Sequence, residues 1–149
     1  MYSIGQVSEM FNIPASTLRY YDKEGLFPAM ERSSGIRQFT DNELDALRVI
    51  NCLKKSGLEI KDIKQFMQWC EEGPSTFKKR LNLFKKQEEK LLSEMAVLNR
   101  ALAMIQYKKW YYQQAIAHEG VEYARAMLPD NLPEHIQQLY NISHMEMIQ

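Results

Sequence analysis

The chain of 149 residues lacks the marks of several common protein classes. Its two cysteines, Cys52 and Cys70, are too few for a disulfide framework and fit a reducing cytoplasm. It has no apolar run of about 18 residues, and its first residues combine no basic segment with an apolar one, so we expect neither a membrane span nor a secretory signal. Glycine-rich phosphate loops, paired-cysteine motifs and nucleophile elbows are absent too. The sequence therefore predicts no enzyme, and we assign no catalytic residue, no metal site and no cofactor.

The chain also lacks an overall excess of charge of either sign, but its charges are unevenly distributed. Residues 1–75 have a net charge of −2, residues 76–112 of +6 and residues 113–149 of −4. Proteins that hold nucleic acid through a general positive field concentrate basic residues in the binding part. If the first 75 residues bind DNA, they must therefore do so through a few well-placed cations.

The segment Ser16 to Gly25 predicts a short helix that is rich in hydrogen-bond donors. Ser16 is expected to cap its N-terminus and Gly25 to end it in the left-handed conformation. Leu18 and Tyr21 supply the inward face. Such a helix fits the DNA major groove, where arginine reads guanine and threonine or tyrosine reaches a phosphate or a thymine methyl group. The candidate DNA-binding residues on it are Ser16, Thr17, Arg19, Tyr20 and Lys23.

A first helix is expected immediately before this segment, from Ile4 to Phe11, with Ser3 as its cap. Pro14 either closes the turn between the two helices or occupies the first turn of the second. Two short helices joined by a tight turn form the helix-turn-helix unit, whose second helix enters the groove. The alternative is a helical hairpin on the surface that contacts no DNA.

Two further helices and a small wing are expected after Gly25. The Ser33-Ser34-Gly35 turn lies between two short extended segments, and Arg37 belongs to the second. Thr40 and Glu43 form a capping box for a helix to about Ser56. Its core residues are Leu44, Leu47, Ile50 and Leu53. A fourth helix is expected from Ile60 to about Cys70, followed by a hinge at residues 71–74.

A long helix is expected from Ser75 or Thr76 to about Tyr112, and its apolar residues alternate at spacings of four and three. At ~1.5 Å per residue it would span roughly 55 Å. A lone amphipathic helix of this length needs a partner surface, and the same helix of a second subunit is the expected partner. An intramolecular hairpin is the alternative. The apolar residues, which we call the apolar stripe, are Phe77, Leu81, Phe84, Leu91, Met95, Leu98, Leu102, Ile105 and Tyr112.

The tail, residues 113–149, is acidic and rich in methionine and aromatic residues. We expect a helix from Ala115 to Met127, a break at residues 129–133 and a short helix from Glu134 to Tyr140. The tail either covers the end of the coiled coil or the other subunit, or lines a pocket for an effector.

The first 70 residues resemble the DNA-binding domain of the MerR family of transcription regulators. The resemblance is carried by IGQV at 4–7, TLRYYDKEGL at 17–26 and GIRQF at 35–39. It implies a mainly all-α fold, with a winged helix-turn-helix head at 1–73, an antiparallel coiled-coil dimerisation helix at 74–112 and a C-terminal effector or covering tail at 113–149. It also implies that Arg37 contacts the phosphate backbone or the minor-groove edge, where the alternative is a solvated loop arginine.

The family's mechanism implies that a homodimer binds a palindromic site in double-stranded promoter DNA and activates RNA polymerase by distorting an overlong promoter spacer. Metal-sensing members use cysteines near the start of the long helix and in a loop after it, and this chain has none there.

The resemblance is closest to the aldehyde- and electrophile-responsive branch, a group of stress-response regulators with a lone cysteine before a Gly-Leu pair. Here that cysteine is Cys52, and Arg48 and Lys55 lie four before and three after it. Nearby cations favour the reactive thiolate, whereas the helix C-terminus opposes it. The hypothesis is that a small electrophile modifies Cys52. The alternative is that Cys52 is a half-buried packing residue, and Cys70, beside two glutamates, is expected to be inert.

Two rival functions stay open at this point. One is a regulator whose tail binds a small organic effector, and the other is an architectural DNA-bending protein without an effector.

Overall fold

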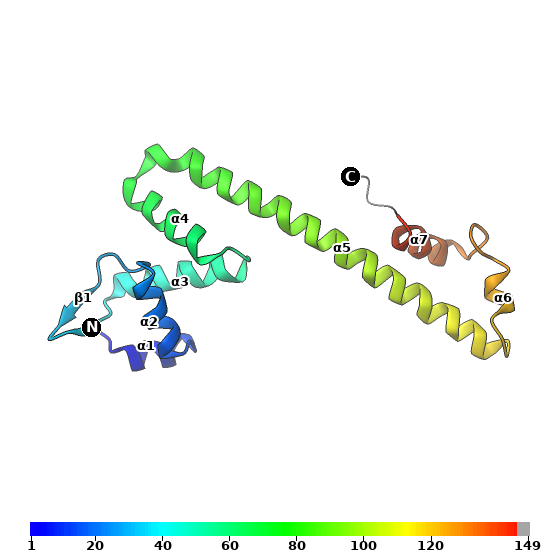
Figure 1. Cartoon of the computed structure of the whole chain (residues 1–149), viewed down its shortest axis with the longest axis horizontal. Coiled ribbons are helices and arrows are strands. Elements are labelled where there is room, and N and C mark those ends of the chain that lie inside the picture. Colours follow the sequence, from blue (N-terminus) through cyan, green and yellow to red (C-terminus); the bar gives the residue numbers. More distant parts are fainter. Residues whose placement is uncertain (146–149) are drawn as a thin grey trace. The chain divides into compact units, whose positions relative to one another are not determined.

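The computed structural model describes residues 1–145, which divide into two compact units, Met1–Gln87 and Glu88–Gln149. The elements of the first unit are α1 (Ile4–Phe11), α2 (Ala15–Lys23), β1 (Glu31–Ser33), β2 (Ile36–Gln38), α3 (Asp41–Lys55), α4 (Ile60–Glu72), the 3₁₀ turn η1 (Pro74–Thr76) and the start of α5 (Phe77–Ala117). The second unit contains the rest of α5, α6 (Glu122–Arg125) and α7 (Glu134–Ser143). The fold is mainly helical, as expected, and Figure 1 shows the elements in chain order. No helix within residues 1–145 combines the length and the apolar character needed to cross a bilayer.

Side-chain caps define where two of the helices of the head begin, and both were predicted. Ser3 and Gln6 form a capping box at α1, in which the Ser3 backbone N–H donates to Gln6 Oε1 over 2.8 Å. Thr40 and Glu43 form the corresponding box at α3. Each box satisfies backbone N–H groups that the first turn of a helix leaves without a partner.

The N-cap of helix α2 is Pro14, two residues earlier than expected, so the prediction that Ser16 caps it is wrong. The boundary residue is Pro14, whose backbone is extended (φ −56°, ψ 139°) and whose carbonyl accepts from Thr17 N over 2.9 Å. Because the proline ring already fixes the φ angle that a helix needs, Ala15 can be helical and Ser16 lies inside the first turn. Gly25 adopts a φ of +81°, which confirms its role as the left-handed stop.

The wing consists of the antiparallel strands β1 and β2, with Arg32 opposite Arg37, and the expected turn lies between them. Ser34 and Gly35 occupy this turn with φ angles of +52° and +80°. An isolated bridge between Tyr2 and Phe39 joins the chain start to the end of the wing. The wing is therefore fastened at its base and exposed at its turn.

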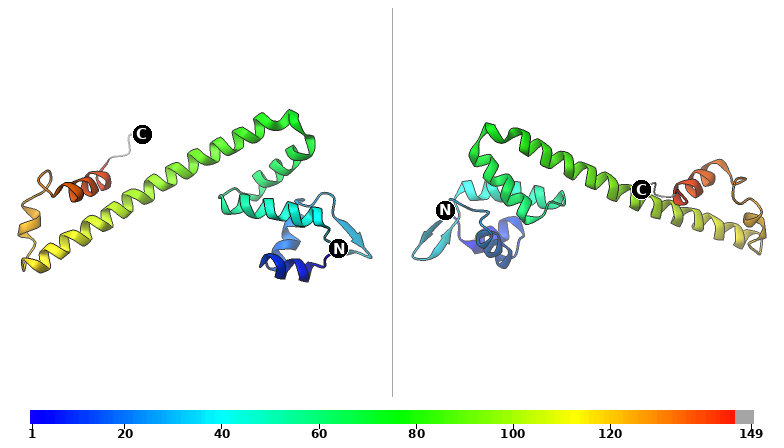
Figure 2. Two further views of the ribbon diagram at one scale, coloured as in Figure 1. Left: turned by 180° about the vertical axis from the view of Figure 1, so that it is seen from behind. Right: turned by 45° about the horizontal axis from the view of Figure 1, so that its top comes forward.

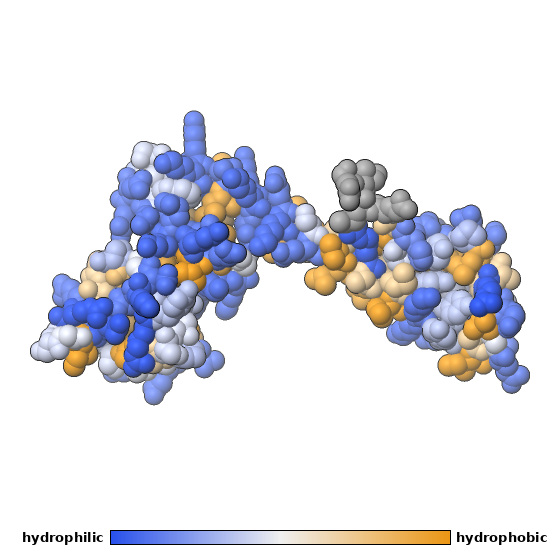
Figure 3. Space-filling model, in the orientation of Figure 1, coloured by the Kyte–Doolittle hydropathy of each residue, from blue (hydrophilic) through white to orange (hydrophobic). Residues whose placement is uncertain are grey.

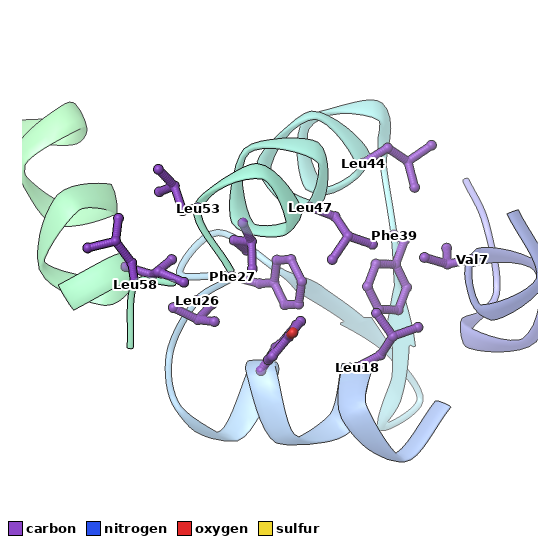
Figure 4. Packing of buried hydrophobic residues seen from close by; sticks show 12 residues of the cluster. Val7, Leu18, Leu26, Phe27, Phe39, Leu44, Leu47, Leu53 and Leu58 are labelled. Carbon is purple, nitrogen blue, oxygen red and sulfur yellow. The ribbon is translucent and has the colours of Figure 1, made fainter. Parts of the chain in front are cut away.

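A single apolar core holds α1 to α4 together, and Figure 4 shows part of it. The rings of Phe27 and Phe39 meet edge to face, with centroids 5.7 Å apart. Leu18 of α2 packs in the same cluster and is fully buried. The residues predicted for the core side of α3 are all buried, namely Leu44, Leu47, Ile50 and Leu53.

In the second unit, α5 continues to Ala117, five residues beyond the expected end at Tyr112. The predicted helix from Ala115 to Met127 is not continuous, because α5 ends at Ala117, Glu119 takes a φ of +52°, and beyond it only the four residues of α6 are helical. The predicted short helix from Glu134 is confirmed and continues to Ser143. The views of Figures 1 and 2 agree that α7 runs back beside α5. Of the tail, Glu146 to Gln149 lie outside the described residues.

The tail covers one side of α5 and leaves the apolar stripe exposed. Tyr107 is 3% exposed under α7, whereas Leu98 is 69% exposed. Nine residues separate these two, which is two and a half helical turns and places them on opposite sides. Every residue of the stripe is at least 36% exposed. Figure 3 shows apolar surface along α5. The tail therefore covers α5, but not the stripe.

Candidate DNA interface

Helix α2 presents a polar face that is opposite to its buried face. Leu18 is fully buried and Tyr21 is 6% exposed, so both fix the helix on the core. The exposed residues recur at spacings of three and four, which places them along one side of the helix. They are Ser16, Arg19, Tyr20 and Lys23, and Thr17 at the border of this face is half-buried.

Tyr21 lies in the apolar core beneath this face, and its surroundings favour the neutral phenol over the phenolate. Burial raises the pKa of Tyr21 above its ordinary value, and repulsion from the Tyr20 phenolate adds a second, smaller contribution. The cations of the polar face are Arg19 and Lys23, and the exposed phenol of Tyr20 beside them can donate and accept hydrogen bonds.

Two arginines of the wing are fastened to α2 by one carboxylate. Arg32 Nη2 and Arg37 Nε each donate to Asp22 Oδ2 over 2.7 Å. The Asp22 side chain is 9% exposed and that of Arg37 is 25% exposed, so this contact is partly shielded from water. Two cations on one anion leave a net charge of +1 beside the polar face of α2. This arrangement holds a guanidinium group at a fixed position between helix and wing.

Sequence reasoning missed three lysines that lie near Tyr20. Together with Tyr20, Glu24, Glu59 and Ile60 they line an open hollow of about 570 Å³. The side chain of Lys64 passes close to Gly25, where α2 is terminated, since a Cβ built on Gly25 would lie 3.4 Å from Lys64 Cε. The lysines are Lys54 at the end of α3 and Lys61 and Lys64 in the first turns of α4. The spacing of Lys61 and Lys64 was visible in the sequence, but their proximity to α2 depends on how α3 and α4 fold.

Comparison with known proteins shows the family to which this chain belongs. Residues 2–69 match the MerR HTH family of regulatory proteins. An uncharacterized HTH-type transcriptional regulator of Haemophilus influenzae is 41% identical over 122 residues, which cover 81% of this chain and 90% of that protein. The chain belongs to the MerR family of transcription regulators.

Two further proteins are similar to this chain. The crystal structure of HiNmlR, described as a MerR family regulator lacking the sensor domain and bound to promoter DNA, has 40% sequence identity and a TM-score of 0.62. The match covers 82% of this chain and 98% of HiNmlR. The regulator AdhR of Bacillus subtilis is 32% identical over 91 residues, which cover 60% of this chain and 65% of AdhR.

Cys52 of this MerR-family chain is exposed near the end of α3 and not half-buried, as the alternative to the sensing hypothesis expected. Its carbonyl accepts from Ser56 N over 3.0 Å and from Ser56 Oγ over 2.9 Å. The Ser56 carbonyl in turn accepts from Gln87 Nε2 of α5 over 2.8 Å. Arg48 pairs with Asp45 and lies over the Phe11 ring at 5.9 Å.

The thiol of Cys52 is therefore accessible, and its backbone lies one turn from a contact between α3 and α5. Cys70 is exposed as well, on α4. Within residues 1–145, no group of three or more histidine, cysteine, aspartate or glutamate side chains is arranged to hold a metal ion.

Proposed function

We propose that this protein binds a palindromic promoter site as a homodimer, with α2 of each protomer in the major groove. The observation that carries the proposal is the exposed polar face of α2, which stands opposite the buried Leu18 and Tyr21. Arg19 on this face is the residue suited to reading guanine, and Tyr20 and Lys23 are suited to phosphates. The DNA-bound state of its relative HiNmlR supports the assignment.

Phosphate contacts are assigned to the cations around this face. Arg37 retains N–H groups other than the one given to Asp22, and it is placed to reach the backbone beside α2. Lys54, Lys61 and Lys64 would hold a phosphate on the other side of Tyr20. Each neutralised phosphate releases a counterion, so affinity should fall steeply as salt rises.

The homodimer is assigned to the apolar stripe of α5. Its residues are 36–69% exposed, although leucine, phenylalanine and isoleucine at regular spacing are typical of a buried seam. A second copy of the same helix has the matching pattern, and an antiparallel pair gives a two-fold dimer that reads a palindrome. A hollow of about 530 Å³ lined by Leu92, Met95, Leu98 and Leu102 lies on α5 and would be filled by the partner helix.

The proposed mode of activation is distortion of the promoter spacer. A dimer bound between the two elements that RNA polymerase contacts can bend and untwist the DNA so that they align. Deforming a site of this length costs a few kcal/mol, which protein–phosphate contacts offset. The protein then acts as an activator without chemistry of its own.

The effector is proposed to be a small reactive aldehyde that adds to the thiol of Cys52. The accessibility of Cys52 supports this role, and so does the hydrogen-bonded route from its carbonyl through Ser56 to Gln87 of α5. A modified side chain at this turn of α3 can therefore alter how α3 meets α5. In the alternative proposal, the effector is a small organic molecule bound by the tail, for which the cluster of Tyr107, Tyr140 and His144 would be the contact.

The test is DNA binding and transcription in vitro, with the DNA upstream of the protein's own gene and purified RNA polymerase. Arg19→Ala should reduce affinity by at least tenfold, because a good bidentate base contact is worth about 1–3 kcal/mol. An aldehyde panel should activate the wild type and leave Cys52→Ser silent, with Cys70→Ser as the matched control. Equal responses of wild type and Cys52→Ser would assign sensing to the tail, and DNA binding without any response would favour the effector-free protein.

A further inference from the structure

The corner between α4 and α5 is closed by two polar side chains whose contacts the DNA-binding proposal does not use. Helix α4 ends at Gly73, which takes a φ of +88°, and the three residues of η1 lead into α5. The last carbonyl groups of a helix have no partner within it. At this corner the carbonyls of Trp69 and Gly73 each accept a backbone N–H group, and the side chains of Thr76 and Arg80, which we call the corner pair, add further hydrogen bonds to the same two carbonyls.

The corner pair makes a dense set of hydrogen bonds. Arg80 Nη2 donates to the carbonyls of Trp69 and Gly73, each over 2.8 Å. Arg80 Nε donates to Thr76 Oγ1 over 2.9 Å. The Thr76 hydroxyl lies 2.7 Å from the Trp69 carbonyl and 2.8 Å from that of Gly73, and its one hydrogen can serve either acceptor. Thr76 is 1% exposed, and it is one of the two buried polar side chains within residues 1–145.

The hydrogen bonds of Arg80 depend on the direction of its N–H groups as well as on its charge. The guanidinium group of Arg80 is planar and directs its N–H groups at three fixed acceptors, while its other side lies over the Phe77 ring, 4.9 Å from the centroid. A lysine at this position would keep the charge but could not reproduce the three directions. The pair therefore fixes an angle between α4 and the first turns of α5.

Other contacts also hold the first turns of α5, among them the packing of Leu83 against the apolar core. The rings of Phe66 and Phe84 meet edge to face at 5.4 Å, and Gln87 donates to the Ser56 carbonyl. Both lie further along α5, away from the corner. The apolar ring contact can slide, whereas the hydrogen bonds of the corner pair cannot do so without breaking.

We propose that Thr76 and Arg80 are positioning residues that set the angle between α4 and α5, and thereby the separation of DNA half-sites that the dimer accepts. The inference rests on the proposed homodimer on palindromic DNA. Helix α4 has 13 residues and is therefore about 20 Å long. A rotation of roughly 10° at one end moves the other by ~3.5 Å, which is close to one base-pair step.

The test uses the full-length protein and a DNA duplex selected by the wild type from a random palindromic library. Duplexes with one or two base pairs inserted or removed at the centre then give a spacing profile. Thr76→Val and Arg80→Lys should accept the neighbouring spacings, with discrimination against them reduced about tenfold. Thr76→Ser should keep the wild-type profile because it retains the hydroxyl group. Lys78→Gln, which removes an exposed charge on the same turn, serves as the control for charge.

An unchanged spacing profile in folded, dimeric Thr76→Val and Arg80→Lys would overturn the proposal. A second measurement needs no DNA. Spin labels at Met10→Cys and Lys86→Cys, in chains whose own cysteines are serine, report the distance between α1 and α5. That distance should shift or broaden in Thr76→Val and stay sharp in Thr76→Ser, and identical distributions would also overturn the inference. If the wild type selects no duplex, the proposed function fails while the spin labels still decide the role of the corner pair.

Discussion

The two sides of α5 have a similar apolar content but opposite surroundings. On one side, Ala103, Tyr107 and Tyr111 are 3–9% exposed because α6, α7 and their connections pack on them. On the other side, each residue of the apolar stripe stays at least 36% exposed among residues 1–145, although Phe84 meets the Phe66 ring of α4. A single chain thus buries only the side that its tail can reach. The comparison shows that the tail covers one side of α5 within its own chain, while the stripe, to which we assign the proposed homodimer, stays exposed.

The largest expected effect comes from charging the stripe. Burial of a leucine or methionine side chain stabilises by about 1.5–3 kcal/mol, so Met95→Asp with Leu102→Asp in both protomers should weaken the dimer by at least ~4 kcal/mol, about a thousandfold in dissociation constant. Sedimentation or light scattering would show monomers and DNA affinity would fall with the loss of the dimer. Val97→Asp is the matched control, since Val97 is 52% exposed but is not a residue of the apolar stripe. A dimer that survives the double change would assign the stripe to another partner.

The next effect is expected on the covered side. Tyr107 contacts Tyr140 edge to face at 5.3 Å, and Tyr107→Ala should destabilise the second unit by about 3 kcal/mol, as large-to-small changes of buried aromatic residues do. Thermal unfolding followed by circular dichroism measures this loss. Tyr112→Ala, on the stripe, is the comparison, and it should weaken the dimer while leaving the packing of the tail intact. Equal tail destabilisation by both changes would contradict the division into two sides.

A smaller and more local effect is expected from enlarging an alanine. Ala103 is 3% exposed beneath the tail, so Ala103→Leu should cost about 1–3 kcal/mol through overpacking. Ala101→Leu changes an exposed position of the same helix and should stay within about 0.5 kcal/mol of the wild type. Proteolysis of the tail at limiting protease concentration would rank the two variants. A stable Ala103→Leu protein would mean that the tail can move away from α5.

The smallest effect is a dependence on alkaline pH. Burial raises the pKa of Tyr107, with repulsion from Tyr111 and Tyr140 adding to it. The folded state therefore holds this proton more tightly than the unfolded chain, and its contribution is fully present below pH ~10, the ordinary tyrosine value, and is lost as pH rises further. Urea unfolding between pH 9 and 11 should show a shallower decline for Tyr107→Phe. Part of the decline should persist, because burial also raises the pKa of Tyr21.

Most of the head could be predicted because its signals are local. The capping boxes at Ser3 and Thr40, and the left-handed stop at Gly25, each depend on residues within a few positions of one another. The buried side of α3 follows from helical spacing alone. Ser16 was misplaced because the N-cap lies at Pro14, two residues earlier, a shift that spacing cannot reveal.

The contacts that could not be predicted join residues far apart in the chain. Asp22 binds Arg32 and Arg37, which are ten and fifteen residues away, and no spacing rule covers such a pair. The corner pair depends on the bend at Gly73. In the tail, the helix ended early because the left-handed backbone at Glu119 lets the chain turn back onto α5, where burial of Tyr107 outweighs local helix propensity.

The double contact of Asp22 also has a consequence for how the protein searches a genome. One carboxylate cancels part of the charge of two arginines, and residues 1–75 are already slightly acidic, with a net charge of −2. Binding to arbitrary DNA depends almost entirely on charge, so the residence time on wrong sequences is short. Recognition is then governed by the ratio of affinities for right and wrong sites rather than by tight binding to all of them. The Asp22 contact is thus expected to favour discrimination between DNA sites over tight binding to every sequence.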